Sequence, residues 1–287
     1  MRIDSAEDAR TYLAQMVNSS SSKPQGLNLY YCALAFSCVL NDHDDITSHI
    51  HHFEEMCDKL AALYQRCLRD GEEDTVLLRH QCIVGVLFDD AGYRGDEKDF
   101  DNLDNADMFY VVERRRGLPV ALAILYIQLA KSQNWQATGT SFPGYFVLRL
   151  CHGSQHILVD AFREGKVLEA GDLRQILKVF VGQNAELSQD YYNDVSDHAV
   201  LVRLQNNLKT RLIDLERYQD ALSVVDITRV LVPDEYRLYF DAAMLKVKVG
   251  QIKGAQEDVC AYLDATHDQY ERQLGEQLLS EIQRQMN

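Results

Sequence analysis

The chain has 287 residues, of which 46% are hydrophobic and 25% charged, and its formal net charge is −15. This length allows one large or two medium domains with buried cores. The acidic balance excludes an extended nucleic-acid surface, which needs clustered lysine and arginine. The seven cysteines include no Cys-x-x-Cys pair, so they indicate reduced thiols and a cytoplasmic location.

No segment predicts secretion or membrane insertion. The first four residues, Met-Arg-Ile-Asp, are too polar to begin a secretory signal. The longest apolar run, residues 118–127, is too short to span a bilayer. No membrane partner is therefore expected.

The first part of the chain is predicted to be helical. Residues 1–26 are expected to hold a short helix, over residues 5–17, and a Ser-rich linker. Apolar residues at helical spacing then predict three helices, over residues 27–40, 47–67 and 75–91.

A loop rich in Gly, Asp and Asn, residues 92–107, precedes a predicted helix over residues 108–116 that Gly117 is expected to end. Pro119 suits the first turn of the next helix, over residues 119–133. That helix is apolar on nearly every side, so it belongs in the middle of a domain.

Three strand-like runs follow and predict an antiparallel meander, at residues 146–150, 157–162 and 166–168. Packed on the central helix, the meander makes residues 27–190 an α+β domain.

Residues 195–287 form a purely helical tail with an internal repeat. A shift of 34 residues places Ala221 on Ala255 and Val225 on Val259, and this is the spacing of tetratricopeptide repeats. Two units and one further helix are fewer than the three repeats usually needed for independence. The tail is therefore expected to lean on the front domain.

Linked motifs carry a family resemblance. They stand at residues 92–96 (Gly-Tyr-Arg-Gly-Asp), 111–123, 142–149 (Phe-Pro-Gly-Tyr-Phe-Val-Leu-Arg), 159–165 and 204–209. Over roughly residues 27–270 the chain resembles the bacterial Sir B family of transglutaminase-like proteins with C-terminal tetratricopeptide repeats, and a related domain occurs in a eukaryotic F-box protein. The resemblance implies a papain-like α+β fold that descends from an enzyme.

The resemblance also implies where a catalytic triad would stand. Transglutaminase-like enzymes carry a Cys at the start of the central helix, then a His and an Asp on the following strands. These positions fall on Ala121, Tyr145 and Asp160. A methyl group cannot attack an acyl carbon, and a phenol with a pKa near ~10 is a poor base at neutral pH. We expect Tyr145 to donate a hydrogen bond to Asp160 and keep the old cleft closed. The alternative is that Tyr145 lines an open pocket with its hydroxyl in water.

These residues predict a non-catalytic protein-interaction or regulatory module. The alternative is an active cysteine-dependent amidase, peptidase or acyltransferase with a displaced triad. Cys82 and Cys151 are then the nearest candidates in sequence, but neither is predicted at a helix start, where a thiolate is favoured.

No metal or cofactor is expected. Four histidines cluster without a Cys or Glu-x-x-His element to complete a ligand set, at His43, His49, His51 and His52. The acidic loop over residues 96–104 lacks the sixth-position Gly and twelfth-position Glu of a calcium loop.

The candidate partner-binding residues form two groups, and the partner is expected to be a protein or peptide of unknown identity. Arg114, Arg115 and Arg116 are either a carboxylate clamp beside the cleft or a complement to the helix dipole, paired with the acidic loop. The first helices of the tail repeats offer a groove lining for an acidic or C-terminal peptide, or else ordinary surface polarity, at Arg203, Asn206, Arg237, Phe240 and Lys248.

Overall fold

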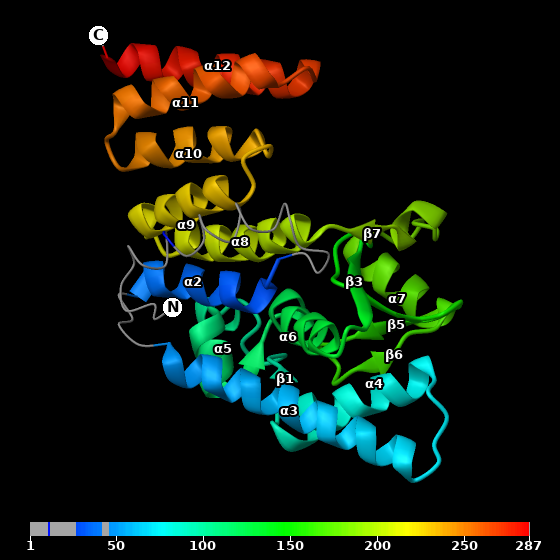
Figure 1. Ribbon diagram of the computed structural model, residues 1–287. Coiled ribbons are helices and arrows are strands. Elements are labelled where there is room, and N and C mark those ends of the chain that lie inside the picture. The colour runs from blue at the N-terminus through cyan, green and yellow to red at the C-terminus, as the bar shows by residue number, and fades with distance from the viewer. Residues whose placement is uncertain (1–10, 12–26, 42–45, 287) are drawn as a thin grey trace.

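The computed structural model describes residue 11 and residues 27–41 and 46–286, in which helices surround a small sheet (Figure 1). Apart from residue 11, the N-terminal helix and linker expected over residues 1–26 lie outside the described residues. The α-helices are α2 (Leu29–Asn41), α3 (Thr47–Arg69), α4 (Val76–Val84), α5 (Met108–Arg114), α6 (Pro119–Ser132), α7 (Ala170–Phe180), α8 (Asp197–Asp214), α9 (Tyr218–Leu231), α10 (Arg237–Lys248), α11 (Ile252–Ala265) and α12 (Gln269–Met286). A π-helix, η1 (Gly85–Asp90), continues α4, and 3-10 turns form η2 (Leu103–Asn105) and η3 (Gln189–Tyr192).

The sheet is antiparallel, with strand order β6-β5-β4-β3-β7. Its strands are β3 (Gln136–Thr140), β4 (Leu148–His152), β5 (Gln155–Asp160), β6 (Lys166–Val167) and β7 (Asp194–Val195). A separate parallel pair joins β1 (Arg94–Gly95) to β2 (Arg116–Gly117). The predicted α+β class and the β4-β5-β6 meander are confirmed, although the prediction missed β3 and β7 and placed β4 about two residues too early and β5 about two residues too late.

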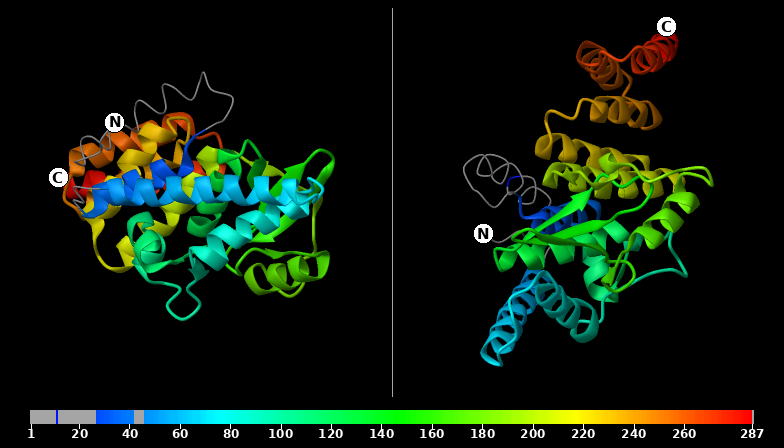
Figure 2. Two further views of the ribbon diagram at one scale, coloured as in Figure 1. Left: turned by 60° about the horizontal axis from the view of Figure 1, so that its bottom comes forward. Right: turned by 90° about the vertical axis from the view of Figure 1, so that its right-hand side faces the viewer.

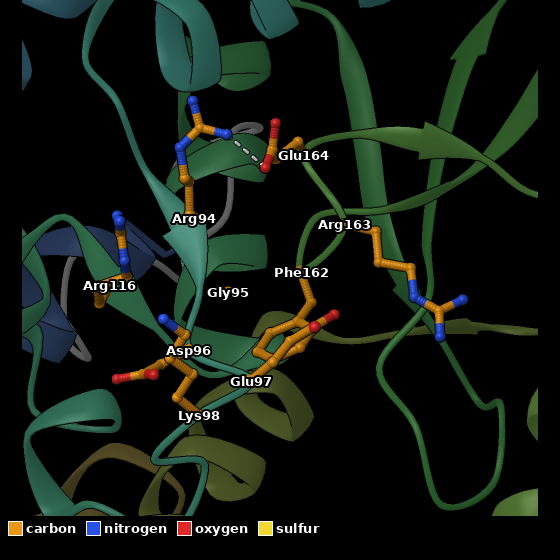
Figure 3. Close-up of a pocket in the computed structure, with 9 residues that line it drawn as sticks. All are labelled: Arg94, Gly95, Asp96, Glu97, Lys98, Arg116, Phe162, Arg163 and Glu164. Carbon is orange, nitrogen blue, oxygen red and sulfur yellow. Dashed lines mark ion pairs between the residues drawn. The ribbon is translucent and has the colours of Figure 1, made fainter.

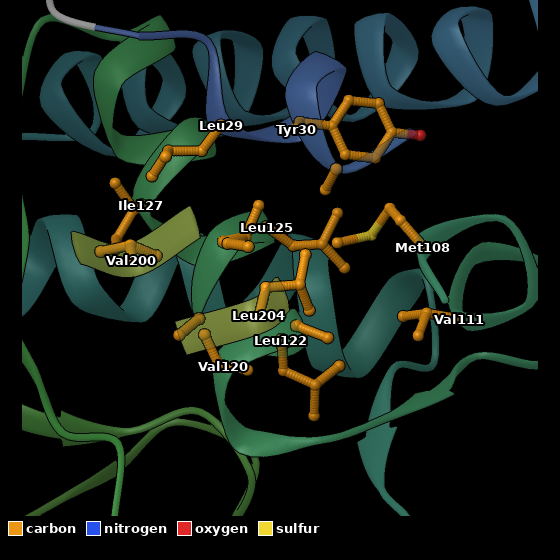
Figure 4. Packing of buried hydrophobic residues seen from close by; sticks show 14 of the residues in the cluster. Leu29, Tyr30, Met108, Val111, Val120, Leu122, Leu125, Ile127, Val200 and Leu204 are labelled. Carbon is orange, nitrogen blue, oxygen red and sulfur yellow. The ribbon is translucent and has the colours of Figure 1, made fainter. Parts of the chain in front are cut away.

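Helix α6 lies at the centre of the molecule. Pro119 occupies its first turn, and 11 of its 14 residues are buried. Side chains of α2, α5 and α8 pack around it in one cluster (Figure 4). Burying a Leu or Ile side chain contributes about 1.5–3 kcal/mol, so a helix that is apolar all round must be covered on every side.

The end of α5 corrects one prediction. The helix ends at Arg114 instead of continuing to Gly117, because Arg115 adopts a left-handed conformation with φ 56°. The Arg115 side chain donates to Tyr93 Oη at 2.7 Å. The backbone carbonyl of Arg115 accepts from the Arg94 N–H at 3.0 Å. Pairing with the chain at residues 93–95 therefore stops the helix and forms β2.

Other elements differ less from expectation. The first two predicted helices correspond to α2 and α3, whereas the third is split into α4 and the π-helix η1. Helix α7 has no counterpart in the prediction. Glu169 and Asp172 form a reciprocal capping box at its start, and Leu173 and Leu177 bury one face.

The tail helices α8–α12 are stacked away from the sheet, and the right-hand view of Figure 2 shows this stack rising from the front part. Both bounds of α11 lie 34 positions after those of α9, so the helices repeat with the period of the sequence. Helices α8 and α9 pack on α2, and α8 also packs on α6. Lys131 of α6 contacts Asp197 of α8 at 2.6 Å. The tail therefore packs against the front part, as predicted.

Among the helices of the described residues, none combines the length and hydropathy that a bilayer-spanning segment requires.

We predict that a fragment of residues 195–287 unfolds with low cooperativity. Val200, Leu201 and Leu204 of α8 are buried in the core shared with α2 and α6, and the fragment would expose them to water. Calorimetry of the fragment beside the full chain measures this. A sharp, independent thermal transition of the fragment would contradict the prediction.

Candidate functional site

The position to which the resemblance assigns a nucleophile holds an alanine. Ala121 is the third residue of α6, two positions after the proline that opens the helix. Its methyl group is completely buried in the main core. A helix start favours a thiolate by its dipole, but here it carries only a methyl group.

Tyr145 and Asp160 are joined as predicted. The Tyr145 hydroxyl lies 3.0 Å from Oδ1 and 3.1 Å from Oδ2 of Asp160, to which it donates. Asp160 is wholly buried at the end of β5 and also accepts from the backbone N–H groups of Phe162 and Arg163. One detail was wrong: Tyr145 stands on the loop before β4, not on a strand. The hydrogen bond therefore ties this loop to the sheet.

The electrostatics keep Tyr145 neutral. Burial, followed by the neighbouring Asp160, raises the pKa of Tyr145 well above its ordinary value. Burial also raises the pKa of Asp160, against the opposing effects of the hydrogen bonds that it accepts. A buried phenol with a raised pKa does not take a proton at neutral pH, so Tyr145 cannot replace a catalytic histidine.

Phe180, the last residue of α7, covers this region. Its ring lies 5.3 Å from the Tyr145 ring. At Gly144, with φ 74°, an added Cβ would come within 2.5 Å of the Phe180 Cβ, so only glycine allows this approach. The sequence analysis missed Phe180, although the helical spacing of apolar residues over 173–177 could have revealed α7.

Two spaces border the rings of Tyr145 and Phe180. One, of about 150 Å³, lies between the start of α6 and α8 and is lined by Phe100, Leu118, Pro119, Val120, Gly144, Tyr145, Phe146, Phe180, Arg203 and Asn207. The other is an outer groove of about 420 Å³, lined by Glu97, Phe100, Tyr145, Phe162, Arg163, Gln175, Ile176, Val179 and Phe180. Tyr145 and Phe180 line both, so they separate the inner space from the groove.

The surroundings of the cysteines bear on the alternative of a displaced triad. All seven are free, and no hydrogen bond among the described residues joins a cysteine to a histidine. Burial raises the pKa of Cys82 to about 12 and also raises that of Cys151, the two candidates closest in sequence. Reactive cysteines need the opposite shift.

The histidine cluster does not form a metal site in the described residues. His43 lies outside them. His49 is buried against the ring of Phe109, whereas the exposed His51 pairs with Glu55 at 3.1 Å. Burial lowers the pKa of His52 to about 4. Within residues 27–41 and 46–286, no three His, Cys, Asp or Glu side chains are placed to hold a metal.

The three consecutive arginines have different surroundings. Arg114 pairs with Asp96 at 3.3 Å and with Asp104 at 3.4 Å, as one interpretation of the sequence expected. Arg115 lies over the Tyr93 ring. Arg116 lines a third groove, of about 500 Å³ (Figure 3). The three side chains therefore do not form a single clamp.

The tail candidates each have their own surroundings. Arg203 faces the front part, where it lies over the Phe146 ring and lines the inner space. The others are distributed over separate contacts, with Arg237 on Glu271, Phe240 beside Tyr262, Lys248 over the Tyr218 ring and Asn206 exposed. Their different contacts do not show the shared groove lining that was expected.

The sequence analysis also missed a buried polar pair, His80 and Tyr126. The His80 Nδ1 lies 2.9 Å from the Tyr126 hydroxyl, and both side chains are buried between α4 and α6. Burial lowers the pKa of His80 to about 4, against the opposing effect of its hydrogen bond to the backbone of Gly165. The lowered pKa favours the neutral form of this histidine at neutral pH.

We predict that Tyr145→Phe destabilises the fold by about 1–3 kcal/mol, because a buried carboxylate loses a donor. The loss should fall toward the lower end, since Asp160 keeps its two backbone donors. Urea denaturation measures the change, with Tyr270→Phe as the control because Tyr270 is 69% exposed. Equal stability of Tyr145→Phe and the wild-type chain would reject the closed-cleft interpretation.

We also predict that His80 makes the fold acid-sensitive. Its pKa is lower when folded than when unfolded, so the unfolded chain binds more protons and stability is lost as pH falls from about 6.5 toward about 4. The expected contribution is about 1.4 kcal/mol by pH 5.5. Urea denaturation at pH 7.5 and 5.5 should show a smaller loss for His80→Gln than for the wild type. An identical loss in both would contradict this assignment.

Comparison with known proteins agrees with this architecture. The family model described as "Transglutaminase-like superfamily" matches residues 51–206, more than half of the chain. A UPF0162 protein of Xylella fastidiosa is 29% identical over 220 residues, which cover 74% of this chain and 78% of that protein. F-box only protein 21 of Mus musculus is 28% identical over 229 residues, which cover 72% of this chain but 35% of that protein.

Among solved structures, the crystal structure of menin aligns with a TM-score of 0.41 and 10% identity over 98% of this chain and 71% of that chain, a likeness too distant to support an argument. The family match rests instead on the segment that contains α6, the sheet and the Tyr145–Asp160 pair. The chain belongs to the transglutaminase-like superfamily.

Proposed function

We propose that this chain is a non-catalytic protein-interaction or regulatory module built on a degenerate transglutaminase-like domain. The observation that carries the proposal is the Tyr145–Asp160 hydrogen bond, beside a helix start that bears Ala121. Acyl transfer through a covalent intermediate needs a nucleophile and a base within hydrogen-bond reach. Alanine supplies no nucleophile, and Tyr145 uses its hydroxyl to hold a carboxylate.

The finer family assignment is part of this proposal. We infer a Sir B-like protein whose α8–α11 form two tetratricopeptide-like units. The 34-residue offset between α9 and α11 supports this inference, as does the matching period in the sequence. Tetratricopeptide-like units lack catalytic chemistry of their own and commonly offer binding surfaces.

The relatives are consistent with a module that works beside other segments. The part of F-box only protein 21 that matches this chain is 35% of that protein, so similar sequence there stands within a much longer chain. All seven cysteines here are free thiols, which fits the reducing cytoplasm that we propose as the location.

We predict that the folded chain is inert toward thiol-directed activity probes at neutral pH. Burial raises the pKa of Cys32, Cys82 and Cys151, so their thiolates are scarce. Labelling by an electrophilic acyl-substrate mimic, read by intact-protein mass spectrometry, tests this. Cys260→Ser is the background control, because Cys260 is exposed.

Rapid, stoichiometric labelling of one cysteine in Cys260→Ser, abolished by denaturation, would overturn the proposal in favour of a cysteine-dependent amidase, peptidase or acyltransferase. Slow labelling that disappears with Cys260→Ser fits the proposal, since it reports simple exposure.

A further inference from the structure

The outer groove beside Tyr145 continues into a second, charged groove. The space of about 500 Å³ that Arg116 lines shares Glu97, Phe162 and Arg163 with the outer groove of about 420 Å³. The two spaces therefore adjoin along these three residues, and we call them together the outer channel. It extends from the β1-β2 pair to the end of α7.

Local backbone pairing builds the charged end. Arg94 and Arg116 are partners in the parallel β1-β2 register, so the two side chains belong to neighbouring positions. Gly95 allows the β5-β6 turn to approach, because an added Cβ would lie 2.5 Å from the Phe162 carbonyl oxygen. In Figure 3 the Phe162 ring lies beside Glu97, while Arg94 points to Glu164.

Several charges at this end are already paired. Arg94 contacts Glu164 at 2.5 Å. Asp96 is held by Arg114, which lies outside the channel lining, at 3.3 Å. These pairs neutralise the charges of Arg94, Glu164 and Asp96 within the protein.

A cationic surplus remains after these pairs. Among the described contacts, the Arg116 guanidinium donates only to the carbonyl of Arg115, at 2.9 Å. Lys98 is exposed, and Arg163 is half exposed with its nearest carboxylate at 3.9 Å. Glu97 is the one lining acid that has no ion pair in the described part of the chain. Arg163 has Asp160 as its ion-pair partner. Among the described lining residues, this leaves two unpaired cations, Arg116 and Lys98, against one unpaired acid. This surplus favours a carboxylate from a partner.

The other end of the channel is apolar and open. Val179 and Phe180 are 75% and 49% exposed, and Phe100 on the facing loop is 39% exposed. Large apolar side chains gathered at the rim of a groove are typical of a protein-interaction site.

We propose that the outer channel binds an extended peptide segment of a partner protein that carries an Asp or Glu beside a large apolar side chain. The acidic side chain pairs with Arg116, and the apolar side chain packs on Val179 and Phe180. This inference rests on the proposed interaction function and adds the surface and the chemistry of the partner. The overall negative charge disfavours a nucleic-acid occupant.

Selection of phage-displayed random dodecapeptides on the full-length chain tests the proposal. The expected result is enrichment of peptides with an acidic residue at a fixed spacing from an aromatic or large aliphatic one. Fluorescence anisotropy with a selected peptide should then show binding weakened about tenfold or more by Arg116→Gln, and similarly by Val179→Asp. The matched control is Arg284→Gln, on an exposed site of α12, which should bind unchanged. Thermal melting checks that each variant is folded.

The outcomes separate this inference from the function on which it rests. If selected peptides bind both channel variants as tightly as the wild-type chain, the outer channel is not their binding site. That result would overturn this inference but would not contradict the proposed interaction function. Enrichment of apolar peptides without an acid would overturn the role of Arg116. Failure to enrich any peptide would overturn the assignment of the outer channel as a peptide-binding site. The thiol-probe experiment tests the absence of catalysis independently of this result.

Discussion

The burial of α6 on every side is the constraint on which the rest of the structure depends. An apolar helix cannot be left with one face in water, so α2, α3, the sheet and α8 must all be placed around it. Because α8 belongs to the tail, this requirement joins the front part and the tail in one hydrophobic core. Arg211 of α8 extends the same connection, since it donates to the Phe100 carbonyl at 3.0 Å and thereby holds the loop that bears Phe100.

The same packing accommodates the residues at the positions that the resemblance assigns to a triad. The start of α6 remains in place with Ala121, whose small methyl group fits a completely filled core. Asp160 would be costly to bury alone, and the hydroxyl of Tyr145 and two backbone donors satisfy it. Phe180 then covers the pair. The proposed partner-binding surface lies outside this region, along the outer channel between Arg116 and Val179.

Much of the fold was predictable because it follows local patterns. The spacing of apolar residues identified α3 and α6, and the strand-like runs at residues 146–150 and 157–162 identified the β4-β5 hairpin. The strands β3 and β7 were missed because Gln136–Thr140 lacks an alternating apolar pattern and Asp194–Val195 is only two residues long. These strands exist because neighbouring strands supply their hydrogen bonds, which is a tertiary effect.

For the site, the sequence by itself determined which groups are present: Ala121, Tyr145 and Asp160 at the three triad positions, and thus the absence of a nucleophile and base there. The Tyr145–Asp160 partnership was also predictable, since a buried hydroxyl and a buried carboxylate need each other. Only the tertiary structure decided that Arg116 lines a groove while Arg114 pairs with Asp96, because sequence neighbours can face different surroundings once a left-handed residue turns the chain. The sequence states that both positions are arginines, but the surroundings of each arginine depend on contacts with segments that are distant along the chain.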